Sequence, residues 1–240
     1  MDESILLWAV GIIVAVLLWA VPIDKIKDQF KAYSIVAYID SLNIRQEFKV
    51  AIVDDEISNY PLDYIKELGF SVKEYDSVSF ADAQELVKND LLLLDVKGVV
   101  KEDLEEGGAK LIKIIKEERP LIPVIAVSSG YFHTELNDYF KISDSTLNKP
   151  IDEYKIRELL FELKREFFDA VLIAKTIECC IRKLDIGKLN KNKLNKSVID
   201  FVSRKISKTE LLNIIHTYAK GESQEIINNS AILLDRVANA

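Results

Sequence analysis

The chain has 240 residues, of which 49% are apolar and 30% charged, with 8 Gly, 5 Pro and 2 Cys. This composition excludes a disordered, collagen-like or disulfide-stapled protein, and the length allows one large domain or two small ones. The cysteines are the neighbours Cys179 and Cys180, which excludes a CxxC zinc site and favours a reducing compartment. With 32 Lys and Arg against 39 Asp and Glu, the formal charge is -7, so the whole chain is not expected to bind nucleic acid.

An uncharged apolar segment near the N-terminus predicts a membrane-spanning helix. It runs from Ile5 to Ile23, with the sequence ILLWAVGIIVAVLLWAVPI, and carries Trp8 and Trp19 near its ends. Its length suffices to cross the hydrocarbon core, and indole rings favour the membrane interfaces. A secretory signal peptide is the alternative, but such peptides begin with basic residues, whereas this chain begins with Asp2 and Glu3. We therefore predict a retained transmembrane helix within residues 1–23.

Basic residues flank only the C-terminal end of this segment. Lys25, Lys27 and Lys31 follow it and no Lys or Arg precedes it. The positive-inside rule therefore predicts a single-pass protein of the cell membrane, with the N-terminus outside and the rest of the chain in the cytoplasm. Residues 24–46 are predicted as a juxtamembrane helix and linker, because apolar residues from Asp24 to about Leu42 approach a helical period. Such a helix could pair with a second copy, forming a homodimer, or pack on the following domain.

Short apolar runs that fit buried strands alternate with helical patterns between residues 47 and 168. The runs are continuous rather than alternating, which is typical of parallel strands covered on both faces. We therefore predict an α/β fold, a doubly wound sheet of five parallel strands with helices on both faces. The predicted strands are 48–53, 71–75, 91–94, 123–127 and 146–148, and the predicted helices between them are 62–68, 80–88 and 109–118.

Polar side chains that can carry chemistry follow four of these strands. Asp54 and Asp55 follow the first strand, Asp95 the third, Ser128 the fourth and Lys149 the fifth. In a doubly wound sheet the functional crevice lies outside the carboxyl ends of the strands. Three carboxylates, one hydroxyl and one ammonium are therefore expected to meet at one edge of the sheet.

Phosphoryl transfer to a carboxylate is the chemistry that needs this set. A hard divalent cation such as Mg²⁺ would bridge the clustered carboxylates, remove their repulsion and hold a phosphate oxygen. The Lys149 ammonium would neutralise charge on the phosphoryl group, and the Ser128 hydroxyl would hydrogen-bond to one of its oxygens. Asp95 is then the predicted nucleophile, forming an aspartyl phosphate.

Five motifs support this interpretation: VDDE at 53–56, LLLLD at 91–95, GGAKLIKIIK at 107–116, PVIAVSS at 123–129 and NKP at 148–150. Together they resemble the receiver domain of bacterial response regulators, over residues 47–168. The resemblance implies a flavodoxin-like fold, Mg²⁺ as the cofactor, and a histidine kinase or phosphotransfer protein as the partner.

The resemblance also implies a role for each matching residue. Asp95 would be the phosphoacceptor and, with Asp54 and Asp55, a metal ligand. Ser128 would be the switch hydroxyl, and Lys149 the phosphate-contacting lysine before a cis proline, Pro150. Lys97 lies where the family lends a backbone carbonyl to the metal.

Two departures from the family pattern bear on activity. Lys97 is expected to place a cation beside the metal site and either to weaken Mg²⁺ binding or to shift the stability of the phosphorylated state, and Thr146 replaces the aromatic residue that usually reports phosphorylation. A pseudo-receiver that binds a partner at the membrane without phosphorylation is therefore the alternative. A haloacid-dehalogenase-type phosphatase also uses a nucleophilic Asp. It is disfavoured because that family places a second Asp where Lys97 stands and its further acidic pair after the Lys.

The remaining residues, 169–240, predict an all-α segment. The helical pattern from Glu153 to Leu184 extends past the last receiver helix, either as a single long helix or with a break near Phe168 or Asp169. Residues 187–196 are predicted as a basic connector, followed by helices at 196–205, 208–218 and 223–238. From Cys180 onward there are 11 Lys and Arg against 6 Asp and Glu, a charge of +5. A basic helical module could contact acidic lipid or nucleic acid, or it could simply be a solvated partner-binding domain.

These patterns together predict a membrane-anchored response regulator. It would accept a phosphoryl group on Asp95 in a Mg²⁺-dependent reaction and relay the change to its C-terminal helices. It would catalyse its own phosphorylation without being a turnover enzyme.

Overall fold

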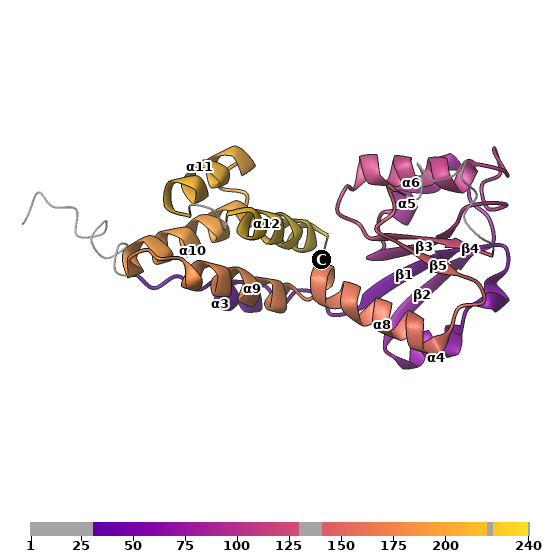
Figure 1. The fold of residues 1–240 in the computed structure, drawn as a ribbon, viewed down its shortest axis with the longest axis horizontal. Helices are drawn as coiled ribbons and strands as arrows, with labels where there is room; N and C mark the ends of the chain where they lie inside the picture. The colour runs from indigo at the N-terminus through magenta and orange to yellow at the C-terminus, as the bar shows by residue number, and fades with distance from the viewer. Residues whose placement is uncertain (1–30, 130–140, 220–222, 240) are drawn as a thin grey trace, which may run out of the picture.

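The computed structural model describes residues 31–129, 141–219 and 223–239, which form a sheet unit and a helical unit side by side (Figure 1). The segment predicted to span the membrane, Ile5 to Ile23, lies outside these residues. Among the described residues, no helix combines the length and the apolar character that crossing a bilayer requires.

The sheet unit contains five parallel strands in the order β2-β1-β3-β4-β5. The α/β fold and the parallel sheet predicted from the sequence are therefore confirmed. Each strand begins within two residues of its predicted start. The strands are β1 (Phe48–Val53), β2 (Phe70–Tyr75), β3 (Leu91–Asp95), β4 (Val124–Ser128) and β5 (Ser145–Asn148).

Helices cover both faces of this sheet, which explains the unbroken apolar runs. In β3, Leu92 and Leu94 belong to the core on one face, while Leu91 and Leu93 belong to the core on the other. Successive side chains of a strand point to opposite faces, so both sets must be apolar when both faces are covered. The first face carries α5 (Ala83–Leu86) and α6 (Gly107–Glu118), and the second carries α4 (Leu62–Glu67) and α8 (Glu153–Leu163). Short 3₁₀ turns lie at Ile57–Asn59 and Phe80–Asp82.

The helical unit has a hydrophobic core of its own, contributed by segments from both sides of the sheet unit. The segment before the sheet supplies Ile35 and Ile39, which are fully buried among residues of the C-terminal helices. The π-helix Lys164–Phe168 links α8 to these helices, so the break predicted near Phe168 is confirmed. The helices of this unit are α3 (Ile35–Ser41), α9 (Ala170–Lys183), α10 (Lys188–Val202), α11 (Lys208–Tyr218) and α12 (Ser223–Ala238).

The helix predicted from Asp24 to about Leu42 is wrong over residues 31–34, which are not helical. Helix α3 begins only at Ile35, and Ser34 caps it by accepting a hydrogen bond from the Ala37 N–H. The Tyr33 N–H donates instead to the side chain of Asn192, at 2.7 Å. This tertiary contact holds the chain out of the helix just before α3 begins.

The basic connector predicted at residues 187–196 is also wrong, because these residues form the first half of α10. Leu194, Val198 and Phe201 recur at helical spacing and are buried in the core of the helical unit. The many Lys and Asn residues concealed this periodicity. By contrast, the bounds predicted for α11 and α12 are confirmed, and Ser207 caps α11 in a reciprocal capping box with Glu210.

The two units meet at the amino edge of the sheet, where α12 reaches the segments that precede β1 and β3. Arg119, at the end of α6, pairs with Asp235 of α12 at 2.8 Å. Arg236 of α12 is buried, and its Nε donates to the Phe168 carbonyl at 3.2 Å. The helical unit is therefore attached at the edge opposite to the carboxyl ends of the strands.

Candidate functional site

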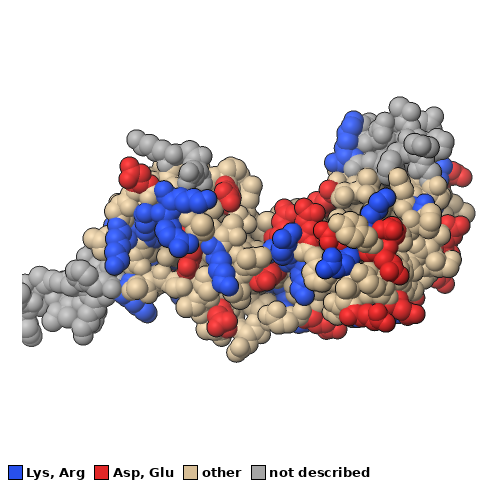
Figure 2. Space-filling view, turned by 60° about the horizontal axis from the view of Figure 1, so that its bottom comes forward, with Lys and Arg blue, Asp and Glu red and all other residues tan. Residues whose placement is uncertain are grey.

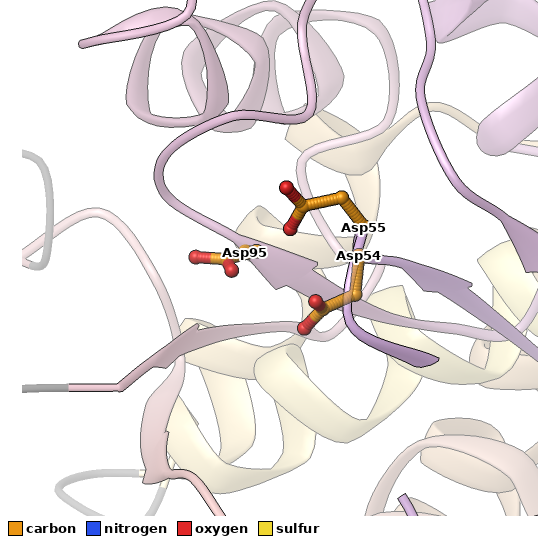
Figure 3. A group of neighbouring side chains, drawn as sticks. All are labelled: Asp54, Asp55 and Asp95. Carbon is orange, nitrogen blue, oxygen red and sulfur yellow. The ribbon is translucent and has the colours of Figure 1, made fainter. Parts of the chain in front are cut away.

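Three carboxylates meet at the carboxyl edge of the sheet, as Figure 3 shows. Asp54 and Asp55 directly follow β1, and Asp95 is the last residue of the neighbouring strand β3. One carboxylate oxygen from each residue lies within 4.8 Å of those of the other two. Asp54 and Asp95 are buried, whereas Asp55 is exposed, so the cluster opens to solvent on one side.

The Lys149 ammonium enters the same cluster from the end of β5. Its Nζ lies 2.8 Å from Asp54 Oδ1 and also donates to Asp95 Oδ2. The lysine side chain is 3% exposed, so these pairs are shielded from water. If all four groups are ionised, three carboxylates against one ammonium leave a formal charge of -2. A divalent cation would neutralise that charge.

The backbone around Lys149 explains how this side chain is positioned. The Lys149 N–H donates to the Ser128 carbonyl at 2.9 Å, which continues the pairing of β4 with β5. The peptide bond between Lys149 and Pro150 is cis, as the resemblance to receiver domains implied. Ser128 is the last residue of β4 and is half-buried at this edge. Its role as a switch hydroxyl stays a prediction.

The surroundings of Lys149 favour its charged, protonated form. Burial lowers the pKa of Lys149, but its hydrogen bonds to Asp54 and Asp95 outweigh that effect and raise the pKa above its ordinary value. Burial raises the pKa of Asp95, opposed by its hydrogen bond and attraction to Lys149. A bound cation would favour the ionised Asp95 carboxylate further.

Tyr60 also belongs to the site, although it was not predicted from the sequence. Its hydroxyl donates to Asp54 Oδ2 at 2.7 Å, while the Glu56 N–H donates to Oδ1 at 2.8 Å. Burial, and then the neighbouring Asp54 carboxylate, raise the pKa of Tyr60, so the phenol remains a donor. These bonds orient the Asp54 carboxylate within the cluster. No periodic pattern marked Tyr60, which lies in an irregular loop after the 3₁₀ turn.

The loop after β3 closes over the cluster at two glycines. Gly98 has a φ of +80°, and a Cβ atom there would lie 3.1 Å from Asp55 Oδ2. A Cβ atom on Gly108, in the first turn of α6, would overlap the Asp95 carbonyl oxygen. Both glycines let the backbone pass close to the acidic residues.

The Lys97 side chain was expected beside the metal site, but its ammonium pairs with Glu105 instead. Its backbone N–H donates to Asp95 Oδ1 at 3.3 Å, and its ammonium lies 3.4 Å from Glu105 Oε2 at the surface. Among the described ion pairs, none joins Lys97 to the three clustered aspartates. The effect of this cation on metal binding stays a prediction. The part proposed for the Lys97 carbonyl as a metal ligand stays a prediction.

The donor set fits a magnesium ion. Carboxylate oxygens are the ligands that hard cations prefer, and the described residues bring no thiolate or imidazole to the cluster. Asp54, Asp55 and Asp95 are the side chains that would hold the ion. Once bound, Mg²⁺ would supply charge neutralisation for a phosphoryl group and a template for its oxygens.

Comparison with known proteins finds similarity in solved structures alone. No protein-family model matches the chain, and no curated protein matches it significantly. Solved structures that resemble it include a CheY-like receiver domain from Methanospirillum hungatei, with 22% identity, 50% of this chain and 99% of that chain covered, and a TM-score of 0.40. A two-component response regulator from Clostridium difficile has 18% identity, 50% and 97% coverage, and a TM-score of 0.41. The chemotaxis protein CheY4 of Vibrio cholerae has 19% identity, 49% and 98% coverage, and a TM-score of 0.39.

The strand order 2-1-3-4-5 is the order found in flavodoxin and CheY, with a functional crevice at the carboxyl ends of the central strands. The sheet unit therefore has the flavodoxin-like fold, which the resemblance to receiver domains implied. We call residues 47–168 the receiver unit below. Its acidic cluster lies between β1 and β3, at the switch point where ligands bind in this fold.

Proposed function

We propose that the receiver unit is a response-regulator domain that accepts a phosphoryl group on Asp95 in a Mg²⁺-dependent reaction. The observation that carries this proposal is the Lys149 ammonium, which bonds both Asp54 and Asp95 within a cluster that Asp55 completes. A histidine kinase or a phosphotransfer protein is the proposed donor. Hydrolysis of the aspartyl phosphate would reset the domain, so we propose a signalling domain and not a turnover enzyme.

The residues divide the reaction between them. An Asp95 carboxylate oxygen attacks phosphorus, and the new O–P bond forms as the bond from phosphorus to the donor's histidine nitrogen breaks. The electron pair of the broken bond stays on that nitrogen. Lys149, charged and already in the pocket, offsets the negative charge that the phosphoryl oxygens bring. The Ser128 hydroxyl, at the end of β4, is the proposed donor to one of those oxygens.

Labelling of the full chain with radioactive acetyl phosphate tests this proposal. We expect Mg²⁺-dependent labelling that excess EDTA prevents and that Asp95→Asn abolishes. Lys149→Met should lower the labelling rate by about 100-fold, the typical effect of removing one preorganised electrostatic contact. Asp76→Asn is the matched control, because Asp76 follows β2 at the same edge but is exposed and outside the cluster. It should label like the wild type.

The alternative function is distinguished by the same measurement. A pseudo-receiver scaffold would show no labelling in the wild type, and Asp95→Asn would leave its partner binding unchanged. Labelling that survives Asp95→Asn would place the phosphoacceptor elsewhere and refute the assignment.

We further propose that residues 5–23 anchor the chain in the cell membrane with both units in the cytoplasm. The apolar run and the lysines that follow it support this placement. Protease treatment of intact spheroplasts and of inverted vesicles tests it. The receiver unit should be protected in spheroplasts and digested in inverted vesicles, and the reverse pattern would refute the orientation.

The proposed output is the helical unit. Helix α8 packs on the sheet through Ile156 and Leu160, and the π-helix Lys164–Phe168 and the non-helical Asp169 join it to α9. π-Helical turns occur frequently at functional sites within helices. A shift of α8 on the sheet would therefore be transmitted directly to the first long helix of the output.

A further inference from the structure

Basic side chains gather at one end of the helical unit. We call residues 182–196 the basic tip. It comprises the end of α9, the connecting turn and the first half of α10. It contains six Lys and Arg and one acidic residue, Asp185. The receiver unit is opposite in charge, with 16 Lys and Arg against 26 Asp and Glu, a formal charge of -10. Figure 2 shows this division, with blue side chains over the helical unit and mostly red ones over the receiver unit.

Most cations of the basic tip have no acidic partner among the residues that the structure describes. Arg182, Lys183, Lys188 and Lys193 are exposed, and the ion pairs of the described residues include none of them. The first turn of α10 contains no acidic residue and Gly187 provides no side-chain cap. Lysines at this end of a helix meet the positive end of its dipole, which is unfavourable. Helix stability therefore does not account for Lys188 and Lys191, whereas Arg182 and Lys183 lie in the last turn of α9, where basic residues are favourable.

An apolar side chain projects among these lysines. Leu189 is 58% exposed, although it lies between Lys188 and Lys191 in the first turn of α10. A leucine flanked by lysines is typical of surfaces that rest on a bilayer, where the apolar group enters the interface and the cations meet headgroups.

The chain leading from the predicted span arrives at the same place. The Asn192 side chain donates to the Lys31 carbonyl at 2.7 Å, and the Asn195 side chain donates to the Tyr33 carbonyl at 2.9 Å. Residue 31 is therefore held against α10. It lies eight positions after Ile23, and eight extended residues reach at most about 28 Å. If the span ends at Ile23, α10 cannot lie far from the membrane surface.

We propose that the basic tip binds the anionic phospholipid headgroups of the membrane in which the chain is anchored. This inference rests on the proposed membrane anchor but not on phosphorylation. It commits to a lipid surface because charge, the exposed leucine and the arrival of the anchoring segment coincide at one place. The acidic receiver unit would be repelled by the same surface, so its pocket would face the cytoplasm and its kinase.

Lysine reactivity in nanodiscs tests the proposal on the full chain. The chain is reconstituted in discs of phosphatidylcholine alone or with about one third phosphatidylserine, and acylation of each lysine is followed by mass spectrometry. We expect Lys188 and Lys193 to react about threefold more slowly in the anionic discs. Lys113, exposed on α6 of the receiver unit, should react equally in both. Equal rates for Lys188 and Lys193 in the two discs would overturn the proposal.

Charge-reversal variants provide a matched control. In Lys188→Glu/Lys193→Glu, the protection of Lys183 by anionic lipid should be lost. In Lys113→Glu/Lys155→Glu, which reverses two exposed lysines of the receiver unit, it should persist. Both variants should still be labelled by acetyl phosphate, which separates this test from the proposed phosphorylation. Protection by an added DNA duplex in neutral discs, without any effect of anionic lipid, would assign the tip to nucleic acid and overturn the proposal.

Failure of the anchor can also be recognised. A chain that does not insert into discs refutes the proposed span, and sedimentation with vesicles then tests the tip by itself. Binding to phosphatidylserine vesicles that Lys188→Glu/Lys193→Glu abolishes would still support the lipid site. Equal sedimentation with neutral and anionic vesicles would overturn it.

Discussion

Arg236 makes a contact between the two units that one substitution can test. The residue belongs to α12 and is 1% exposed. Its guanidinium lies 3.8 Å from the ring centroid of Phe168, donates to the Phe168 carbonyl at 3.2 Å and donates to the Arg45 carbonyl. Arg236→Ala would leave both carbonyls without this donor and open a space over the ring.

The expected loss follows from these contacts. Each hydrogen bond from a charged donor contributes about 1.5–3 kcal/mol, and a desolvated cation–π contact about 2 kcal/mol. The sum overstates the effect, because burial lowers the pKa of Arg236 to about 10, which shows that burying this cation is itself costly. Asp90, 3.9 Å from the Arg236 Nη1, also keeps its pair with Arg45. We therefore expect the free energy of unfolding to fall by about 3 kcal/mol, at the lower end of values for broken buried pairs.

Urea unfolding of the full chain in detergent micelles measures this loss. Circular dichroism at 222 nm is the suitable signal, because both tryptophans, Trp8 and Trp19, lie in the predicted span. Arg157→Ala is the control, since Arg157 is 46% exposed and pairs with its sequence neighbour Glu158. It should change stability by less than about 0.5 kcal/mol. An Arg236→Ala variant as stable as this control would refute the idea that the contact holds the units together.

Three further outcomes follow from single residues. Gly108→Ala should lower the free energy of unfolding in urea by about 1–3 kcal/mol, because the added Cβ overlaps the Asp95 carbonyl oxygen. The better helix propensity of Ala, worth about 1 kcal/mol, opposes this loss. Equal or greater stability of the variant would contradict the close approach of the two backbones. Tyr60→Phe should cost about 1.5–3 kcal/mol in the same assay, because Asp54 loses a buried donor, and a loss under about 0.5 kcal/mol would show that water replaces the phenol. Burial, and then Glu225, raise the pKa of Cys180 to about 11; in a Cys179→Ser variant its reaction with a disulfide reagent should therefore be slow at neutral pH and rise with pH until about 11, and a plateau near pH 9 would contradict this.

The receiver unit could be predicted because its signals are local. A strand covered on both faces must be apolar at every position, so the LLLLD run at 91–95 identified β3 directly. The acidic cluster followed from topology, because parallel strands bring their carboxyl ends to one edge. Helix α11 was predicted with its observed bounds, and the capping box of Ser207 with Glu210 at its start is a local signal as well.

The remaining features depend on contacts between distant segments. Asn192 would favour a loop by composition, but in α10 it binds the backbone near residue 31, more than 150 positions away in the chain. Tyr60 is recognised only once Asp54 is placed beside it. The buried Arg236 resembles a surface residue at the end of a helix until α12 meets the amino edge of the sheet. In each case tertiary context overrides the local preference.

The two edges of the sheet limit how phosphorylation could affect the helices. The acidic cluster lies at the end of β3, whereas Asp90 and the Arg236 contact lie before its start, about 17 Å away for five residues of strand. A phosphoryl group on Asp95 therefore cannot touch the helical unit. A signal from Asp95 to the helical unit must therefore pass through the movement of a helix packed on the sheet. Helix α8 is the candidate, because it covers the sheet and leads to Phe168, whose carbonyl accepts a hydrogen bond from Arg236. Beryllofluoride with Mg²⁺ should then change amide exchange at residues 164–169 in the wild type but not in Asp95→Asn, and a change confined to the pocket would exclude this route.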